Sequence, residues 1–136
     1  MPKIILLVFC ALIPLTAHSV TPNINSYKTC GKLKQAAEAG EPDAQFVYGL
    51  ELTQGKCTFL QLKHPSEGIE WWTKAASQGQ ADARFLLGTA YLKGRGVTKD
   101  SGTAWQFIKN AATRGSQEAK NFLELCQAQP GHSACN

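Results

Sequence analysis

The sequence predicts an all-α fold, an α-α superhelix: a short solenoid of about six antiparallel helices with two disulfides. Three observations predict this fold. The motif Ala-Ala-x-x-Gly occurs three times, at spacings of 39 and 36 residues. Such a period is typical of stacked helix pairs, and apolar residues near each copy recur at helical intervals. The cysteines are even in number once an expected leader is removed.

The N-terminus has the features of a secretory signal peptide. Lys3 precedes a short apolar run over residues 4–15, and small residues follow at alternate positions. The run is shorter than the roughly 20 residues of a membrane-spanning helix, and a buried N-terminal helix is the alternative. We predict a signal peptide over 1–19, with cleavage two residues earlier as the other option. The mature domain, 20–136, is then periplasmic or secreted.

An even number of cysteines in an exported chain predicts disulfides. Four cysteines remain after the leader, and four allow three connectivities. We favour Cys30–Cys57 and Cys126–Cys135, because each pair is local once helices are placed. The cysteine spacings lack a Cys-x-x-Cys or a histidine-bearing pair, so we expect no metal site and no cofactor.

The charge of the chain is modest. Removal of the leader takes away only Lys3, which leaves 13 Lys and Arg against 10 Asp and Glu. These charges are spread without clusters, which together with export argues against a nucleic-acid partner. We also expect no stable membrane insertion after signal cleavage.

Glycine marks the ends of the predicted helices. Gly40, Gly79 and Gly115 each close a copy of the motif, where a left-handed residue terminates a helix. Gly55 and the turn 94–96 break the chain within the units. The expected helices cover residues 26–38, 43–54, 66–77, 82–93, 100–113 and 117–128.

The first helix of each complete unit has one packing stripe at i, i+4 and i+8. Gly49 and Gly88 lie beside this stripe, where a missing side chain lets the partner helix approach closely. The stripe contains Ala44, Tyr48 and Leu52 in one unit and Ala83, Leu87 and Tyr91 in the next.

Several polar and aromatic residues have structural interpretations. Asp100 is the expected N-cap of the fifth helix. Asp43 and Asp82 begin helices, so capping and the helix dipole explain them better than paired catalytic carboxylates do. Trp71-Trp72 aligns with Phe107-Ile108 of the next unit, which predicts that at least one tryptophan ring is in the core.

The second complete unit carries a family resemblance. About ten constrained positions resemble one Sel1-like repeat, a TPR-like α-solenoid unit. The unit over 41–79 matches less fully and has three extra residues in the loop around 59–65. The matching run is Ala83-x3-Leu87-Gly88-x2-Tyr91-x2-Gly94-x-Gly96-Val97-x2-Asp100-x3-Ala104-x2-Phe107-x3-Ala111-Ala112-x2-Gly115.

The resemblance covers nearly all of the mature chain. It divides the chain into a half repeat over 25–40, repeats over 41–79 and 80–115, a half repeat over 116–129 and a tail over 130–136. It implies a right-handed superhelix in which the first helices line a concave surface, and it implies protein binding as the generic activity.

The face opposite the packing stripe is the candidate partner-binding groove. It is partly apolar with a polar margin, as interface patches are. For the two phenylalanines, packing against neighbouring helices is the alternative. Thr53 and Leu92 also fall on this face. The groove residues are Phe46, Leu50 and Gln54; Phe85, Thr89 and Lys93; Asn121 and Leu125.

We find no catalytic constellation in the sequence. His64 and His132 have no acid or nucleophile at helical spacing in this interpretation, and no Ser-x-x-Lys motif occurs in the mature chain. The leading hypothesis is a non-enzymatic periplasmic protein that seats a partner, such as a secreted effector or cell-envelope protein, in its groove. An immunity protein against a secreted toxin is a sharper version. The alternative is a β-lactam-hydrolysing or cell-wall-active enzyme of the cysteine-rich Sel1-like type.

Overall fold

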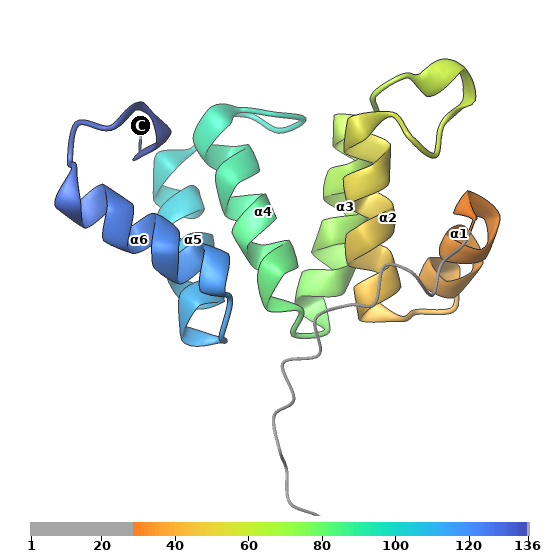
Figure 1. Cartoon of the computed structure of the whole chain (residues 1–136), viewed down its shortest axis with the longest axis horizontal. Helices are drawn as coiled ribbons and strands as arrows, with labels where there is room; N and C mark the ends of the chain where they lie inside the picture. The colour runs from red at the N-terminus through yellow and green to blue at the C-terminus, as the bar shows by residue number, and fades with distance from the viewer. Residues whose placement is uncertain (1–28, 136) are drawn as a thin grey trace, which may run out of the picture.

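The computed structural model describes residues 29–135, which form an all-helical array (Figure 1). Two 3-10 helices, η2 (Phe59–Gln61) and η3 (Ser133–Cys135), lie in the second loop and the tail. The predicted leader lies outside the described residues. The α-helices are α1 (Cys30–Glu38), α2 (Pro42–Gln54), α3 (Pro65–Ser77), α4 (Ala81–Lys93), α5 (Ser101–Thr113) and α6 (Gln117–Ala128).

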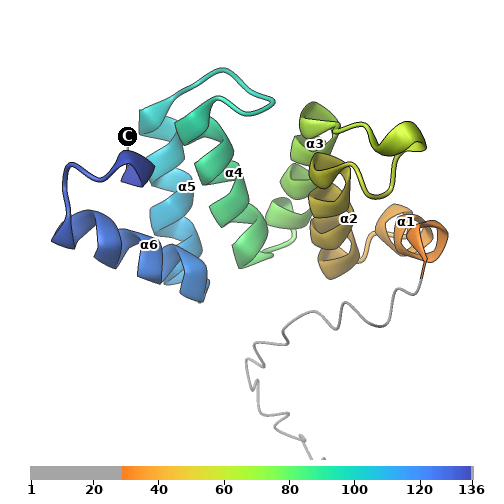
Figure 2. The same ribbon diagram turned by 45° about the horizontal axis from the view of Figure 1, so that its top comes forward.

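The helices pack as antiparallel pairs, as predicted. α2 packs against α3, and α4 packs against α5, and each of these pairs lies side by side in both ribbon views (Figures 1 and 2). α3 and α4 join the two pairs, while α1 and α6 pack on the two ends of the array. All helix limits after α1 lie within one residue of the prediction.

The Ala-Ala-x-x-Gly motif ends each second helix with the same hydrogen bonds. Gly40, Gly79 and Gly115 have φ values of 97°, 98° and 101°. After α3, the Gly79 amide donates to the Ala76 carbonyl and the Gln80 amide donates to the Ala75 carbonyl, both at 3.1 Å. These two bonds are a Schellman motif, which satisfies carbonyls that the helix leaves unpaired. The predicted helix terminators are confirmed.

Glycine also permits the close approach of paired helices. A Cβ atom at Gly49 would lie 2.7 Å from the Trp72 ring and 2.9 Å from the Gly68 carbonyl oxygen. A Cβ at Gly88 would lie 2.6 Å from Ile108 Cγ1. Both predicted approaches are therefore present, between α2 and α3 and between α4 and α5.

The predicted core assignment holds for the tryptophans and fails at Leu92. Trp72 is buried, and its Nε1 donates to the Phe46 carbonyl at 3.1 Å, whereas Trp71 is half-buried. Leu92, which we placed on the open face, is 1% exposed. It packs with Ile108 in a cluster formed by α4, α5 and α6.

Helix caps are predicted correctly in one of three cases. Asp100 caps α5, because its Oδ1 accepts from the Thr103 amide at 3.1 Å. Asp43 and Asp82 lie inside the first turns of α2 and α4, where they suit the helix dipole but cap nothing. The cap of α4 is Gln80, whose side chain accepts from the Ala83 amide at 2.8 Å.

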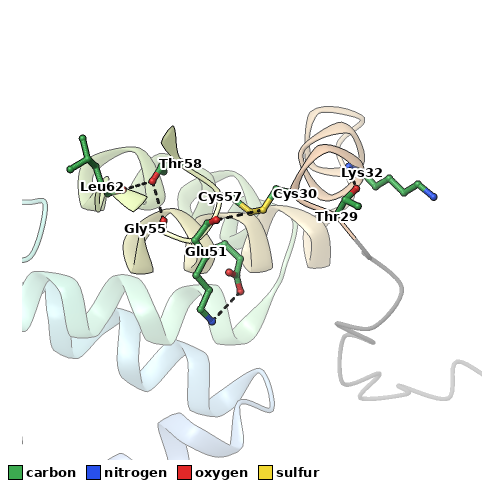
Figure 3. The surroundings of a disulfide bond; sticks show 9 residues. Thr29, Cys30, Lys32, Glu51, Gly55, Cys57, Thr58 and Leu62 are labelled. Atoms are coloured by element: carbon green, nitrogen blue, oxygen red, sulfur yellow. Dashed lines mark hydrogen bonds and ion pairs between the residues drawn. A yellow bond between two sulfur atoms is a disulfide. The ribbon is translucent and has the colours of Figure 1, made fainter. Parts of the chain in front are cut away.

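Both predicted disulfides are present. Cys30–Cys57 ties the start of α1 to the loop after α2 (Figure 3). Near it, the Thr58 hydroxyl donates to backbone carbonyls of the same loop (Figure 3). Cys126–Cys135 folds the tail back onto the end of α6. The two crosslinks therefore fix the two ends of the array.

Candidate functional site

A cleft lies between the two complete units. It encloses about 600 Å³ and is lined by the C-terminal half of α2, the start of α3, α4 and the turn after α4. Figure 1 shows α3 and α4 diverging from the turn that joins them. The lining residues are Leu50, Thr53, Gln54, Lys63, Pro65, Ile69, Trp72, Leu86, Thr89, Ala90, Arg95 and Gly96.

Two loops form the mouth of the cleft. A Cβ atom at Gly96 would lie 2.9 Å from the Pro65 carbonyl carbon, so the turn after α4 touches the start of α3. The Ser66 hydroxyl donates to the Gly96 carbonyl at 3.5 Å across this contact. The extra residues before Pro65 bring Lys63 to the same mouth.

The cleft combines an apolar interior with a basic margin. Ile69 and Trp72 are buried beneath it, and Leu50 and Leu86 pack against the same core cluster. Lys63 and Arg95 are exposed, and neither forms an ion pair within residues 29–135. No acidic residue is among the lining residues in that range.

The structure brings three of the predicted groove residues together. Leu50, Gln54 and Thr89 all line the cleft. The Thr89 hydroxyl donates to the Leu86 carbonyl of its own helix at 2.9 Å. Gln54 is exposed at the end of α2.

The two predicted phenylalanines pack between helices. Phe46 is half-buried against both the α1–α2 cluster and the α3–α4 cluster. Phe85 meets Phe122 of α6 in an edge-to-face contact with ring centroids 5.8 Å apart. The packing alternative therefore describes both rings in this chain.

The remaining predicted groove residues lie outside the cleft lining. Lys93 Nζ donates to the Ser133 carbonyl at 2.7 Å, so this side chain holds the tail. Asn121 Oδ1 accepts a hydrogen bond from the side-chain amide of Gln117 at 2.8 Å, and both residues are exposed on α6. Leu125 is 36% exposed on the same helix. Lys63 and Arg95 line the cleft but were not predicted to do so. In the sequence they are only two cations in different loops.

The prediction that His64 has no acid at helical spacing is wrong. His64 Nδ1 lies 3.8 Å from Glu67 Oε2, because Glu67 is one turn further along at the start of α3. Both side chains are about half exposed. Residues 29–135 contain no group of three or more histidine, cysteine or acidic side chains that could hold a metal ion. The same range has no helix with the length and apolarity to span a membrane.

The chain is similar in sequence to parts of longer proteins. It is 32% identical over 108 residues to DAP3-binding cell death enhancer 1 of Rattus norvegicus, covering 75% of this chain and 20% of that protein. It is 29% identical over 92 residues to alginate biosynthesis protein AlgK of Azotobacter vinelandii, covering 68% and 19%. The chain thus spans about a fifth of the length of these relatives.

Solved structures share the fold. A Sel1 repeat protein from Oxalobacter formigenes is 34% identical, with a TM-score of 0.63 over 69% of this chain and 68% of that one. A protective antigen with an SLR fold from uropathogenic Escherichia coli is 31% identical, with a TM-score of 0.66 over 79% and 22%. Helicobacter pylori cysteine rich protein B, at 23% identity, gives 0.60 over 73% and 72%.

The family profile of the Sel1 repeat matches residues 42–80 and 81–116, more than half of the chain. These ranges correspond to α2–α3 and α4–α5, with the cleft between them. Such helical repeats generally serve as scaffolds for protein interaction. This chain belongs to the Sel1 repeat family.

Proposed function

We propose that the protein is a periplasmic, non-enzymatic binding module that holds a segment of a partner protein in the cleft between its two repeats. The apolar interior and the basic margin of the cleft support this proposal. A segment that inserts an apolar side chain over Leu50 and Ile69, and presents acidic residues to Lys63 and Arg95, complements both features.

The predicted leader and the disulfides support the periplasmic part of the proposal. The leader predicted from the sequence and the two disulfides are both typical of proteins that fold outside the cytoplasm. A narrower proposal is an immunity protein that neutralises a secreted toxin. A cleft between two repeats suits the blocking of a single partner, and a stoichiometric toxin complex is the result expected from that narrower proposal.

The test is affinity capture from periplasmic extract with matched variants. We expect Leu50→Arg to lose the captured partner, because it places a charge in the apolar interior. Leu125→Arg is the control, since Leu125 lies on α6 outside the cleft lining. The melting temperature of each variant shows whether it folds. Equal capture by Leu50→Arg and the native protein would place the interface elsewhere.

A second variant tests the margin without disturbing packing. Lys63 and Arg95 are exposed, so the double variant Lys63→Glu/Arg95→Glu should fold normally. It should slow association with the captured partner, and the difference should shrink at high salt. Unchanged association at low salt contradicts an acidic partner segment. Nitrocefin turnover by the purified protein would favour the β-lactam-hydrolysing alternative.

A further inference from the structure

Two positions that align between the two complete repeats are occupied by glutamine in the first repeat. Gln45 follows the buried alanine of α2, and Gln78 precedes the glycine that ends α3. Gln45 Nε2 donates to the Ala37 carbonyl at 3.1 Å, and Gln45 Oε1 accepts from Gln78 Nε2 at 2.8 Å. Gln45 is 5% exposed, so this pair satisfies a buried amide with neutral hydrogen bonds.

The same two positions carry arginine in the second repeat. Arg84 Nη2 donates to the Ala76 carbonyl at 2.6 Å, which reproduces the bond from Gln45 to the preceding helix. A guanidinium has five donors and no acceptor, so Arg84 and Arg114 have no counterpart of the glutamine bond. Nη1 of Arg84 is buried and finds no hydrogen-bond partner among residues 29–135.

The electrostatics at this position are unbalanced. Burial, and then the like charge of Arg114, lower the pKa of the Arg84 guanidinium. Within the described chain, no carboxylate contributes to that pKa. Arg114 Nε donates to Asn110 Oδ1 at 3.1 Å, so the side chain that accepts this hydrogen bond is neutral.

A hollow of about 270 Å³ adjoins Arg84, and Arg114 is hydrogen-bonded to Asn110, which lines the same hollow. The hollow is lined by Arg84 of α4 and by Gln106, Phe107 and Asn110 of α5. We infer that Arg84 and Arg114 form a binding site for an oxyanion, a carboxylate or a phosphate group, beside this hollow. Guanidinium groups bind both anions with paired hydrogen bonds. This site shares no lining residue with the cleft and does not depend on the proposed function.

The first repeat shows which substitutions remove the charge and keep the fold. Arg84→Gln/Arg114→Gln recreates the pair formed by Gln45 and Gln78, and Arg84→Gln alone keeps a donor for the Ala76 carbonyl. We therefore expect the double variant to fold with an unchanged or higher melting temperature.

The experiment is nuclear magnetic resonance of the full mature chain at constant ionic strength. Sodium acetate and sodium phosphate are titrated separately, with sodium chloride as the reference. We expect saturable shifts at the Nε–H groups of Arg84 and Arg114 and at the side-chain amide of Asn110, which lines the hollow, and loss of the Asn110 shifts in the double variant. Saturation by acetate identifies carboxylate as a source of the anion, and saturation by phosphate identifies phosphate. Shifts no larger than those in chloride for both anions, or saturable shifts at Asn110 that persist in the double variant, would overturn the inference.

Discussion

A methyl group at Gly88 should destabilise the protein, because α4 and α5 touch there. A Cβ atom at this residue would lie 2.6 Å from Ile108 Cγ1 and 3.0 Å from the Ala104 carbonyl oxygen. Ile108 is fully buried, so its side chain cannot turn out into solvent without leaving the core. Overpacking of this kind costs about 1–3 kcal/mol, and the better helix propensity of alanine returns about 1 kcal/mol. Since backbone must move, we take the upper limit of the cost and expect Gly88→Ala to lower the free energy of unfolding by about 2 kcal/mol.

Urea unfolding followed by circular dichroism measures this change, and Gly102→Ala is the control. Gly102 lies in the first turn of α5, where the nearest atom to an added Cβ is Asp100 Oδ1 at 3.4 Å, an ordinary contact. We expect this control to be as stable as the native protein or slightly more stable. If Gly88→Ala proves as stable as Gly102→Ala, the two helices do not pack as closely as the structure shows, and the reasoning is refuted.

Three further predictions concern the crosslinks and one helix cap. Serine at both positions of Cys30–Cys57, a separation of 27 residues, should lower the unfolding free energy in urea by about 3.5 kcal/mol. The same change at Cys126–Cys135, a separation of 9, should cost less, about 2.6 kcal/mol, and the opposite order would contradict the loop-entropy argument. Hydrogen bonds, chiefly from a threonine hydroxyl, lower the pKa of Asp100 below 3.8, so its stabilising effect is complete above that value and is lost as pH falls through the lowered pKa. Asp100→Asn keeps a cap without this titration, and unfolding measured across acidic pH should then lose less stability than the native protein does.

The helix limits were predictable because their signals are local. Gly79 and Gly115 terminate helices by their own backbone conformation, and Asp100 caps the helix that begins next to it. The disulfide pairing followed for the same reason, since each pair joins elements near in sequence. The cap of α4 was not predictable, because the sequence does not distinguish a carboxylate in the first turn, such as Asp82, from one at the N-cap, and Gln80 takes the cap instead.

The groove was only partly predictable, because a helical wheel does not say which neighbour covers a face. Leu92 belongs to the open face of α4 by periodicity, yet α5 and α6 bury it. Lys93 is bonded to the tail, because the second disulfide and η3 bring the Ser133 carbonyl to it. Leu50 and Thr89 line the cleft because they lie at the junction of two repeats, where the packing leaves a space; their role in binding stays a prediction.

The differences between the two repeats locate both candidate sites. Where the repeats agree, as at Gly49 and Gly88, each residue has the same packing role, and agreement signals structure. Where they differ, the fold does not require the second residue: Gln45 shows that the bond made by Arg84 needs no charge. The cleft follows the same logic, because a longer loop in one repeat supplies Lys63 and the shorter turn of the next supplies Arg95. A perfectly regular array would still leave a cleft where two repeats meet, but it would lack Lys63 at the mouth of that cleft and would carry a neutral amide in place of Arg84, so the irregular positions give both candidate sites their charge.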